Sequence, residues 1–246
     1  MVGYYSNYSL ITIQVTNLVN TVFYSLTASL GNLVVREKAH RRYKIFLAIQ
    51  SVSDIVSSIC TTCLFLLFQD LIRVWLGSHF LLSELTLLAI TCNFYLGIIL
   101  LPIWIYREAT GLYQQTKYVM LITAIINLVL SVLMAKWIGI SGILFASAIA
   151  RLLTYFWYEP VLLFRKYFSV SSSVYFFSIA KNILATVVVI FINHSLFTHF
   201  YVHGWLSLLF KAICIGIISF ATTILLYSRN QGLHLVMHKL ISKKYH

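Results

Sequence analysis

The chain has 246 residues, of which 60% are hydrophobic, 15% aromatic and only 10% charged, and it contains two prolines. A soluble globular domain places charges on roughly 25% of its residues, so this composition argues strongly against one. The formal net charge of +12 comes from lysines and arginines dispersed among short hydrophilic segments, and this dispersion argues against a nucleic-acid partner.

Apolar runs without charge recur along almost the whole chain, and each is about as long as the roughly 20 residues that cross a hydrocarbon core. We therefore predict an all-α fold, a polytopic transmembrane helix bundle with about seven spans in the lipid bilayer. The predicted spans, in chain order, are 6–33, 45–68, 82–105, 119–136, 140–163, 175–198 and 205–228.

The first predicted span carries no charge before Arg36, yet it is too long and too polar for a secretory signal peptide. Its polar residues recur at the spacing of one helical face: Asn7, Gln14, Asn17, Thr21 and Ser25. Amides facing lipid are costly, so we expect this face to look into a bundle or a water-filled cavity. Hydrogen bonding between neighbouring helices is the alternative interpretation.

The second predicted span repeats this pattern with Ser51, Asp54, Ser58 and Thr61. Asp54 and, in the fifth span, Arg151 lie near the middle of the membrane, where an ionisable residue indicates a functional site. Lys181 and Lys211 lie nearer to span ends, where a long side chain reaches the headgroups by snorkelling.

Lysines and arginines are unevenly divided between the two sets of connections. Only Arg73 and Lys136 lie in the second, fourth and sixth connections. Thirteen of the 18 lie in the first, third and fifth connections and the tail: Arg36, Lys38, Arg41, Arg42, Lys44, Arg107, Lys117, Arg165, Lys166, Arg229, Lys239, Lys243 and Lys244. The positive-inside rule then predicts an external N-terminus, a cytoplasmic C-terminus, and external positions for Ser78 and His203.

Catalytic and metal-binding patterns are absent from the sequence. It contains no nucleophile elbow, phosphate-binding loop or paired carboxylates, and the CTTC segment at Cys60 and Cys63 has no second ligand pair that would complete a zinc site. We therefore expect a protein that is not an enzyme and needs no cofactor or metal.

An ordered set of segments resembles the C-terminal half of Wzx-type polysaccharide flippases, in the multidrug/oligosaccharidyl-lipid/polysaccharide superfamily. The segments are VGYYSNYSLI, SLTASLGNL, VWLGSHFLLS, NFYLGIILLPIWIYREATGLYQQTKY and IINLVLSVLMAKWIGISGILFASAIARLLTYFWYEPVLLFRKYF. The resemblance implies a C-terminal lobe with a MATE-like fold over residues 1–168, two additional helices over 169–228, and a basic cytoplasmic tail over 229–246. It also implies that Met1 corresponds to an internal position, so that the chain is a fragment lacking an N-terminal lobe.

The function implied by the resemblance is export of undecaprenyl-diphosphate-linked oligosaccharide units for capsule or exopolysaccharide biosynthesis, by alternating access in a bacterial cell membrane. The substrate-binding residues would be Arg151, Gln14, Asn17, Lys181 and Lys211. Asp54 would carry a coupling H⁺ or Na⁺. The missing N-terminal lobe would be a partner.

Arg151 keeps two interpretations, a diphosphate contact through its planar fork and a structural salt bridge with Asp54. Three other functions remain for the chain as a whole: a cation-coupled drug exporter of the same fold, a seven-span receptor-like protein, and a membrane ligase or acyltransferase. The last would need a long outer loop with catalytic residues, and the predicted outer loops are short.

Overall fold

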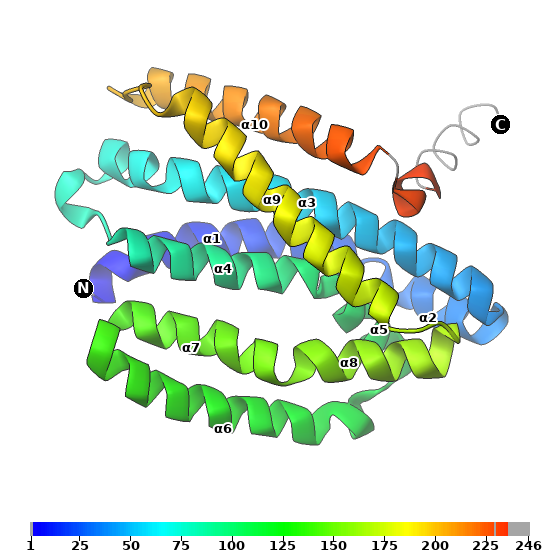
Figure 1. The fold of residues 1–246 in the computed structure, drawn as a ribbon. Coiled ribbons are helices and arrows are strands. Elements are labelled where there is room, and N and C mark those ends of the chain that lie inside the picture. The colour runs from blue at the N-terminus through cyan, green and yellow to red at the C-terminus, as the bar shows by residue number, and fades with distance from the viewer. Residues whose placement is uncertain (1, 229, 236–246) are drawn as a thin grey trace.

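A computed structural model describes residues 2–228 and 230–235, and these form helices joined by short turns, with no strand among them (Figure 1). The all-α prediction is thus confirmed. The α-helices are α1 (Val2–Tyr24), α2 (Thr27–Arg36), α3 (Ala39–Trp75), α4 (Glu84–Ile99), α5 (Leu101–Thr110), α6 (Tyr113–Ile138), α7 (Ile140–Leu153), α8 (Tyr155–Leu163), α9 (Ser173–Phe197) and α10 (Trp205–Tyr227). Two short elements complete the set, the 3₁₀ turn η1 (Ser78–Phe80) and the π-helical turn η2 (Phe164–Phe168).

Six of the described helical segments are long and apolar enough to cross a membrane, and the bent pair α4–α5 makes a seventh if it counts as one span. This confirms a polytopic helix bundle. The six segments are Gly3–Arg36, Ala39–Trp75, Tyr113–Ile138, Ile140–Phe168, Ser173–Phe197 and Trp205–Tyr227. Most of the predicted basic tail, 229–246, lies outside the described residues.

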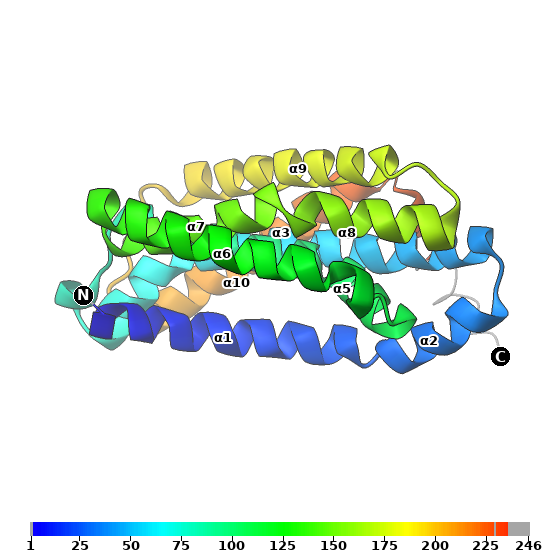
Figure 2. The same cartoon turned by 90° about the horizontal axis from the view of Figure 1, so that it is seen from below.

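The helices run up and down between the two ends of the bundle (Figures 1 and 2). Helix α3 packs against α4, α9 and α10, α4 also packs against α7, and α7 forms a close hairpin with α6. Helix α1 lies along one side of the bundle and packs mainly on α4 and α5. As a result, α1 and α6 are the least covered of the long helices.

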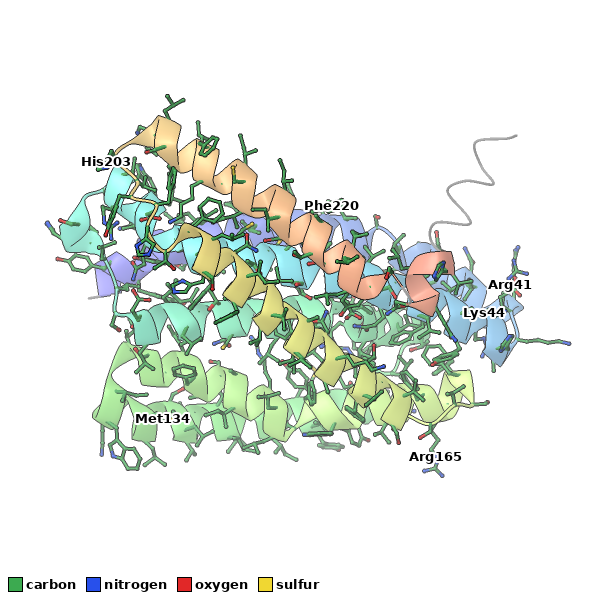
Figure 3. All side chains as sticks on the ribbon, turned by 45° about the horizontal axis from the view of Figure 1, so that its top comes forward. Arg41, Lys44, Met134, Arg165, His203 and Phe220 are labelled. Carbon is green, nitrogen blue, oxygen red and sulfur yellow. The ribbon has the colours of Figure 1, made fainter. Side chains whose placement is uncertain are left out.

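Basic residues from separate connections gather at one end of the bundle, which we call the basic end. Arg41, Lys44 and Arg165 lie there, whereas His203 and Met134 lie toward the opposite end, which we call the far end (Figure 3). The connections predicted to be cytoplasmic therefore share one end of the fold. The side of the membrane that this end faces stays a prediction.

The break between α4 and α5 follows from Pro102, which has no backbone N–H to give to the carbonyl of Ile98, four residues earlier. Ser53 of α3 supplies the missing donor, because its hydroxyl lies 2.7 Å from that carbonyl oxygen. The two helices meet at an angle of 42°. A single predicted span, 82–105, is thus two half-helices that expose backbone carbonyls to α3.

The α6–α7 hairpin depends on two glycines. Gly139 adopts a positive φ of 60° between the two helices, a conformation that favours glycine. Gly142 lies against the backbone of Met134, so close that a Cβ atom would overlap its carbonyl. The WIGIS segment is therefore a tight turn between the two helices.

Near the basic end, Arg107 and Glu159 form a buried ion pair between α5 and α8. The guanidinium lies 2.7 Å from Glu159 Oε1, and the two side chains are only 12% and 2% exposed. The sequence pattern placed Arg107 in a hydrophilic connection. In the structure α5 continues through this position and ends at Gly111, whose positive φ closes the helix.

Candidate functional site

Helices α1, α4, α5 and α7 enclose a groove of about 290 Å³ that holds Arg151. Its remaining lining residues are Tyr5, Ser9, Thr12, Ile13, Thr16, Ile90, Asn93, Phe94, Gly97, Trp104 and Leu144. We call this the Arg151 groove. It contains hydroxyl and amide groups, three aromatic rings and one formal charge, which is positive.

Arg151 is half-buried, and its guanidinium belongs to none of the ion pairs or hydrogen bonds found among residues 2–228 and 230–235. The predicted salt bridge with Asp54 is therefore wrong. Asp54 is buried in the interface of α3 with α9, whereas Arg151 lies on α7, facing α1 and α4. The guanidinium thus keeps its five N–H donors for a ligand or for water.

Two further features make the Arg151 groove suited to a polar ligand. The Oδ1 atom of Asn93 is buried without a hydrogen-bond partner, while its Nδ2 atom donates to the carbonyls of Ala89 and Leu144. Helix α7 stops at Leu153, and Thr154 interrupts the path into α8. The groove can therefore donate to an anion through Arg151 and accept from a hydroxyl through Asn93.

The predicted residues of α1 are not in this groove. Gln14 and Asn17 are exposed on the surface of the bundle, as are Thr21 and Ser25, so the structure does not bring them together with Arg151. The described helices do not cover this face, and a water-filled cavity beside it stays a prediction. We call Gln14, Asn17 and Thr21 the open polar face of α1.

The α1 residues that do line the Arg151 groove form a second polar series, Tyr5, Ser9, Thr12 and Thr16. Their separations of 4, 3 and 4 residues place them on one helical face. The same periodicity could have revealed them in the sequence. Their side chains are smaller than the amides of Gln14 and Asn17, and hydroxyl groups are an ordinary feature of membrane helices.

The polar residues of the second predicted span are buried, as the pattern indicated. Asp54 is 1% exposed and accepts a hydrogen bond of 2.8 Å from Gln50 Nε2. The same amide lies 3.4 Å from the Ile99 carbonyl at the end of α4. Asp54 Oδ2 and Gln50 Oε1 are buried without partners. Two acceptor atoms therefore remain free beside the α4–α5 break.

Asn182 of α9 joins this cluster to two tyrosines. Its Nδ2 atom donates to the Asp54 carbonyl at 3.0 Å and lies 2.5 Å from the Tyr227 hydroxyl, and its Oδ1 atom accepts from the Tyr95 hydroxyl. A further contact joins Ser58 to Thr223 of α10. We call Gln50, Asp54, Ser58, Asn182 and their partners the buried polar core.

The two lysines differ from each other. Lys181 is exposed, and its ammonium lies 4.4 Å from the centre of the Phe177 ring. Lys211 was expected to snorkel, and this expectation is wrong: the side chain is buried and its Nζ atom lies 2.7 Å from Asp70 Oδ2. Neither lysine lines the Arg151 groove.

Comparison with models of known families, with curated proteins and with solved structures finds no match. Within residues 2–228 and 230–235, no three His, Cys, Asp or Glu side chains are placed to hold a metal ion together. The function is therefore inferred from the residues of the site itself.

Proposed function

We propose that this chain takes part in moving a lipid-linked oligosaccharide diphosphate across a bacterial cell membrane. One observation about Arg151 carries the proposal. This cation lies within a candidate membrane span and has no acidic partner among the described residues. An unpaired cation in low dielectric is costly unless a ligand or water compensates it. A diphosphate is a suitable ligand because the guanidinium fork matches phosphate oxygens.

The residues around Arg151 suit the rest of such a headgroup. Asn93 offers a free acceptor for a sugar hydroxyl, and Tyr5 and Trp104 offer aromatic surface. The polyprenyl chain of the substrate would stay in lipid. The interruption between α7 and α8 at Thr154 also supports transport, because the binding sites of transporters are often formed by discontinuous helices.

Transport by alternating access also needs an opposing unit. The open polar face of α1 supports this part of the proposal, since Gln14 and Asn17 are poor neighbours for lipid. An N-terminal lobe would turn this face into one wall of an aqueous passage, and Gln14 and Asn17 would then contact the headgroup.

Asp54 is the proposed carrier of the coupling H⁺ or Na⁺. It is buried without a cationic partner among the described ion pairs, and its Oδ2 atom and Gln50 Oε1 are both free to accept. The carboxyl end of the half-helix α4 adds backbone carbonyls close by. A bound cation would compensate the carboxylate.

The test is binding of a short-chain polyprenyl diphosphate sugar to the purified chain in lipid nanodiscs. Arg151→Ala should weaken binding by about tenfold or more, and Arg151→Lys should retain part of it, because the charge stays while the fork is lost. Lys181→Ala, which removes an exposed cation outside the groove, is the matched control and should bind as the parent does. Unchanged binding by Arg151→Ala would refute the proposal.

A further inference from the structure

A second cavity, of about 350 Å³, lies near the far end of the bundle, between α3, α4, α9 and α10. We call it the far-end cavity. Its polar lining includes Gln69, Asp70, Arg73, Glu84, Asn193 and Lys211. None of these residues lines the Arg151 groove, so the proposed function leaves this cavity unexplained.

The interior of the far-end cavity is a fixed polar network. Asp70 accepts from Lys211 at 2.7 Å and from Arg73 at 2.9 Å, so both of its carboxylate oxygens are paired. Gln69 is also fixed, because its Oε1 atom accepts from the Tyr8 hydroxyl and its Nε2 atom donates to the Leu82 carbonyl. These residues are held in place without a ligand.

One buried acceptor in this cavity has no partner. Asn193 is fully buried, and its Nδ2 atom donates to the Val189 carbonyl and the Ser219 hydroxyl. Its Oδ1 atom has no hydrogen bond. A buried acceptor without a partner is destabilising, and a ligand that donates a hydrogen bond would remove that cost.

The charges that line the cavity cancel. Asp70 and Glu84 balance Arg73 and Lys211, and His194 is neutral in the formal count. An anionic ligand would have to draw Arg73 or Lys211 away from Asp70 to gain a counter-ion. The cavity thus favours a neutral ligand over an anionic one, and the ligand should both donate and accept hydrogen bonds.

Aromatic rings form much of the remaining wall. Phe65, Phe197, Phe200 and Tyr201 line the cavity beside the polar groups. Sites for small ligands usually combine such apolar surface with a few fixed polar groups in a volume of about 300–1,000 Å³. A sugar ring has this dual character, since its C–H faces pack on aromatic rings and its hydroxyls meet carboxylates and amides.

From this combination we infer that the far-end cavity binds a neutral sugar residue. Glu84 at the exposed rim and Asn193 in the interior accept hydrogen bonds from the hydroxyls, and the aromatic rings contact the ring face. Within the proposed function, such a site would hold part of the glycan, but the inference depends only on the residues of this cavity.

Saturation-transfer NMR on the full chain in nanodiscs tests this inference. The probes are the methyl glycosides of glucose and N-acetylglucosamine, compared with glucuronic acid. The neutral glycosides should bind about tenfold better than glucuronic acid, because only an anion competes with Asp70 for Arg73 and Lys211. Equal binding of glucuronic acid, or no binding of the glycosides, would overturn the inference.

Two exposed residues near the end of α9 provide a matched pair of variants. Thr198 lines the cavity and Ser195 does not. Thr198→Trp fills the mouth and should reduce glycoside binding by about tenfold or more, while Ser195→Trp should leave it within about twofold. Glu84→Ala, at an exposed position, should weaken binding about tenfold without a bulky insertion. If Thr198→Trp, Ser195→Trp and Glu84→Ala all bind the glycosides equally well, the assignment of the sugar site to this cavity is contradicted.

Arg151→Ala separates this inference from the proposed function. It should keep full glycoside binding in the far-end cavity while it loses the diphosphate ligand. Loss of glycoside binding in Arg151→Ala would show that the sugar occupies the Arg151 groove, and the second site would be refuted. Glycoside binding with no diphosphate binding in the parent chain would refute the proposed function alone.

Discussion

Two polar regions of this bundle arise from the same sequence pattern and have opposite surroundings. The buried polar core joins α3, α9 and α10 through Gln50, Asp54 and Asn182, and most of its groups have partners within the chain. On the open polar face of α1, Gln14 and Asn17 are exposed on the bundle surface. The periodicity of polar residues therefore identifies a helical face but not what covers it.

Helix α6 has the apolar exposed surface that a lipid-facing helix requires. Its middle exposes only apolar side chains: Met120, Leu121, Ile122, Ala124, Ile125, Leu128, Val129, Val132 and Leu133. The exposed surface of α1 has amides and hydroxyls at comparable places. This difference supports an aqueous neighbour for α1 and a lipid neighbour for α6.

Arg107 and Arg151 should give the largest contrast. Arg107 is paired with the buried Glu159, so Arg107→Met should lower the free energy of unfolding by about 3–5 kcal/mol. Arg151 has no such partner, and Arg151→Met should change the free energy of unfolding by about 1 kcal/mol or less. Chemical denaturation in detergent gives both values.

The double variant Arg107→Met with Glu159→Leu is the control, and it should recover most of the lost stability because no charge is left unpaired. Equal destabilisation by Arg107→Met and Arg151→Met would mean that Arg151 has a structural partner, contrary to the contrast between the regions.

The next contrast is between two asparagines. Asn182→Leu leaves the Tyr95 and Tyr227 hydroxyls and the Asp54 carbonyl without their shared partner, and it should cost about 2–4 kcal/mol. Asn17→Leu on the open polar face should change the free energy of unfolding by about 0.5 kcal/mol or less. Thermal unfolding in nanodiscs compares the two. A large loss for Asn17→Leu would place this residue in a structural contact.

Two glutamines give a smaller difference. Gln50→Leu removes the donor to Asp54 Oδ1 and should cost about 1–3 kcal/mol, while Gln14→Leu should be close to neutral. Gln50→Glu is not a suitable control because it adds a second carboxylate. Gln50→Asn, which keeps the amide on a shorter stem, should cost less than Gln50→Leu. Neutral behaviour of Gln50→Leu would show that Asp54 does not depend on this hydrogen bond.

Much of the fold could be predicted because apolar run length is set directly by bilayer thickness. The ends of the helices were less predictable. The second predicted span stopped at residue 68, but α3 continues to Trp75. Its last turns carry Asp70, which looks like a loop residue until Lys211 of α10 pairs with it. Such a contact joins positions far apart in the chain, and local hydropathy contains no information about it.

The candidate site was predicted only in part. Arg151 stood out because a charge inside a span is rare, and its groove is present in the structure. Gln14 and Asn17 lie on one face of α1, and neither residue lines the Arg151 groove. Only the packing of α1 on α4 and α5 decides which of its polar faces meets the groove. The far-end cavity was missed because its residues come from four helices.

The central claim is that the open polar face of α1 adjoins water and not lipid. Rates of cysteine modification by a charged thiosulfonate in native membranes test it most directly, in a background with Cys60, Cys63, Cys92 and Cys214 replaced by serine. Asn17→Cys should react about tenfold or more faster than Leu128→Cys, because the reactive thiolate forms only where water reaches. Leu128 lies within the α6 span and is 67% exposed. Equally slow reaction at both positions would contradict the claim.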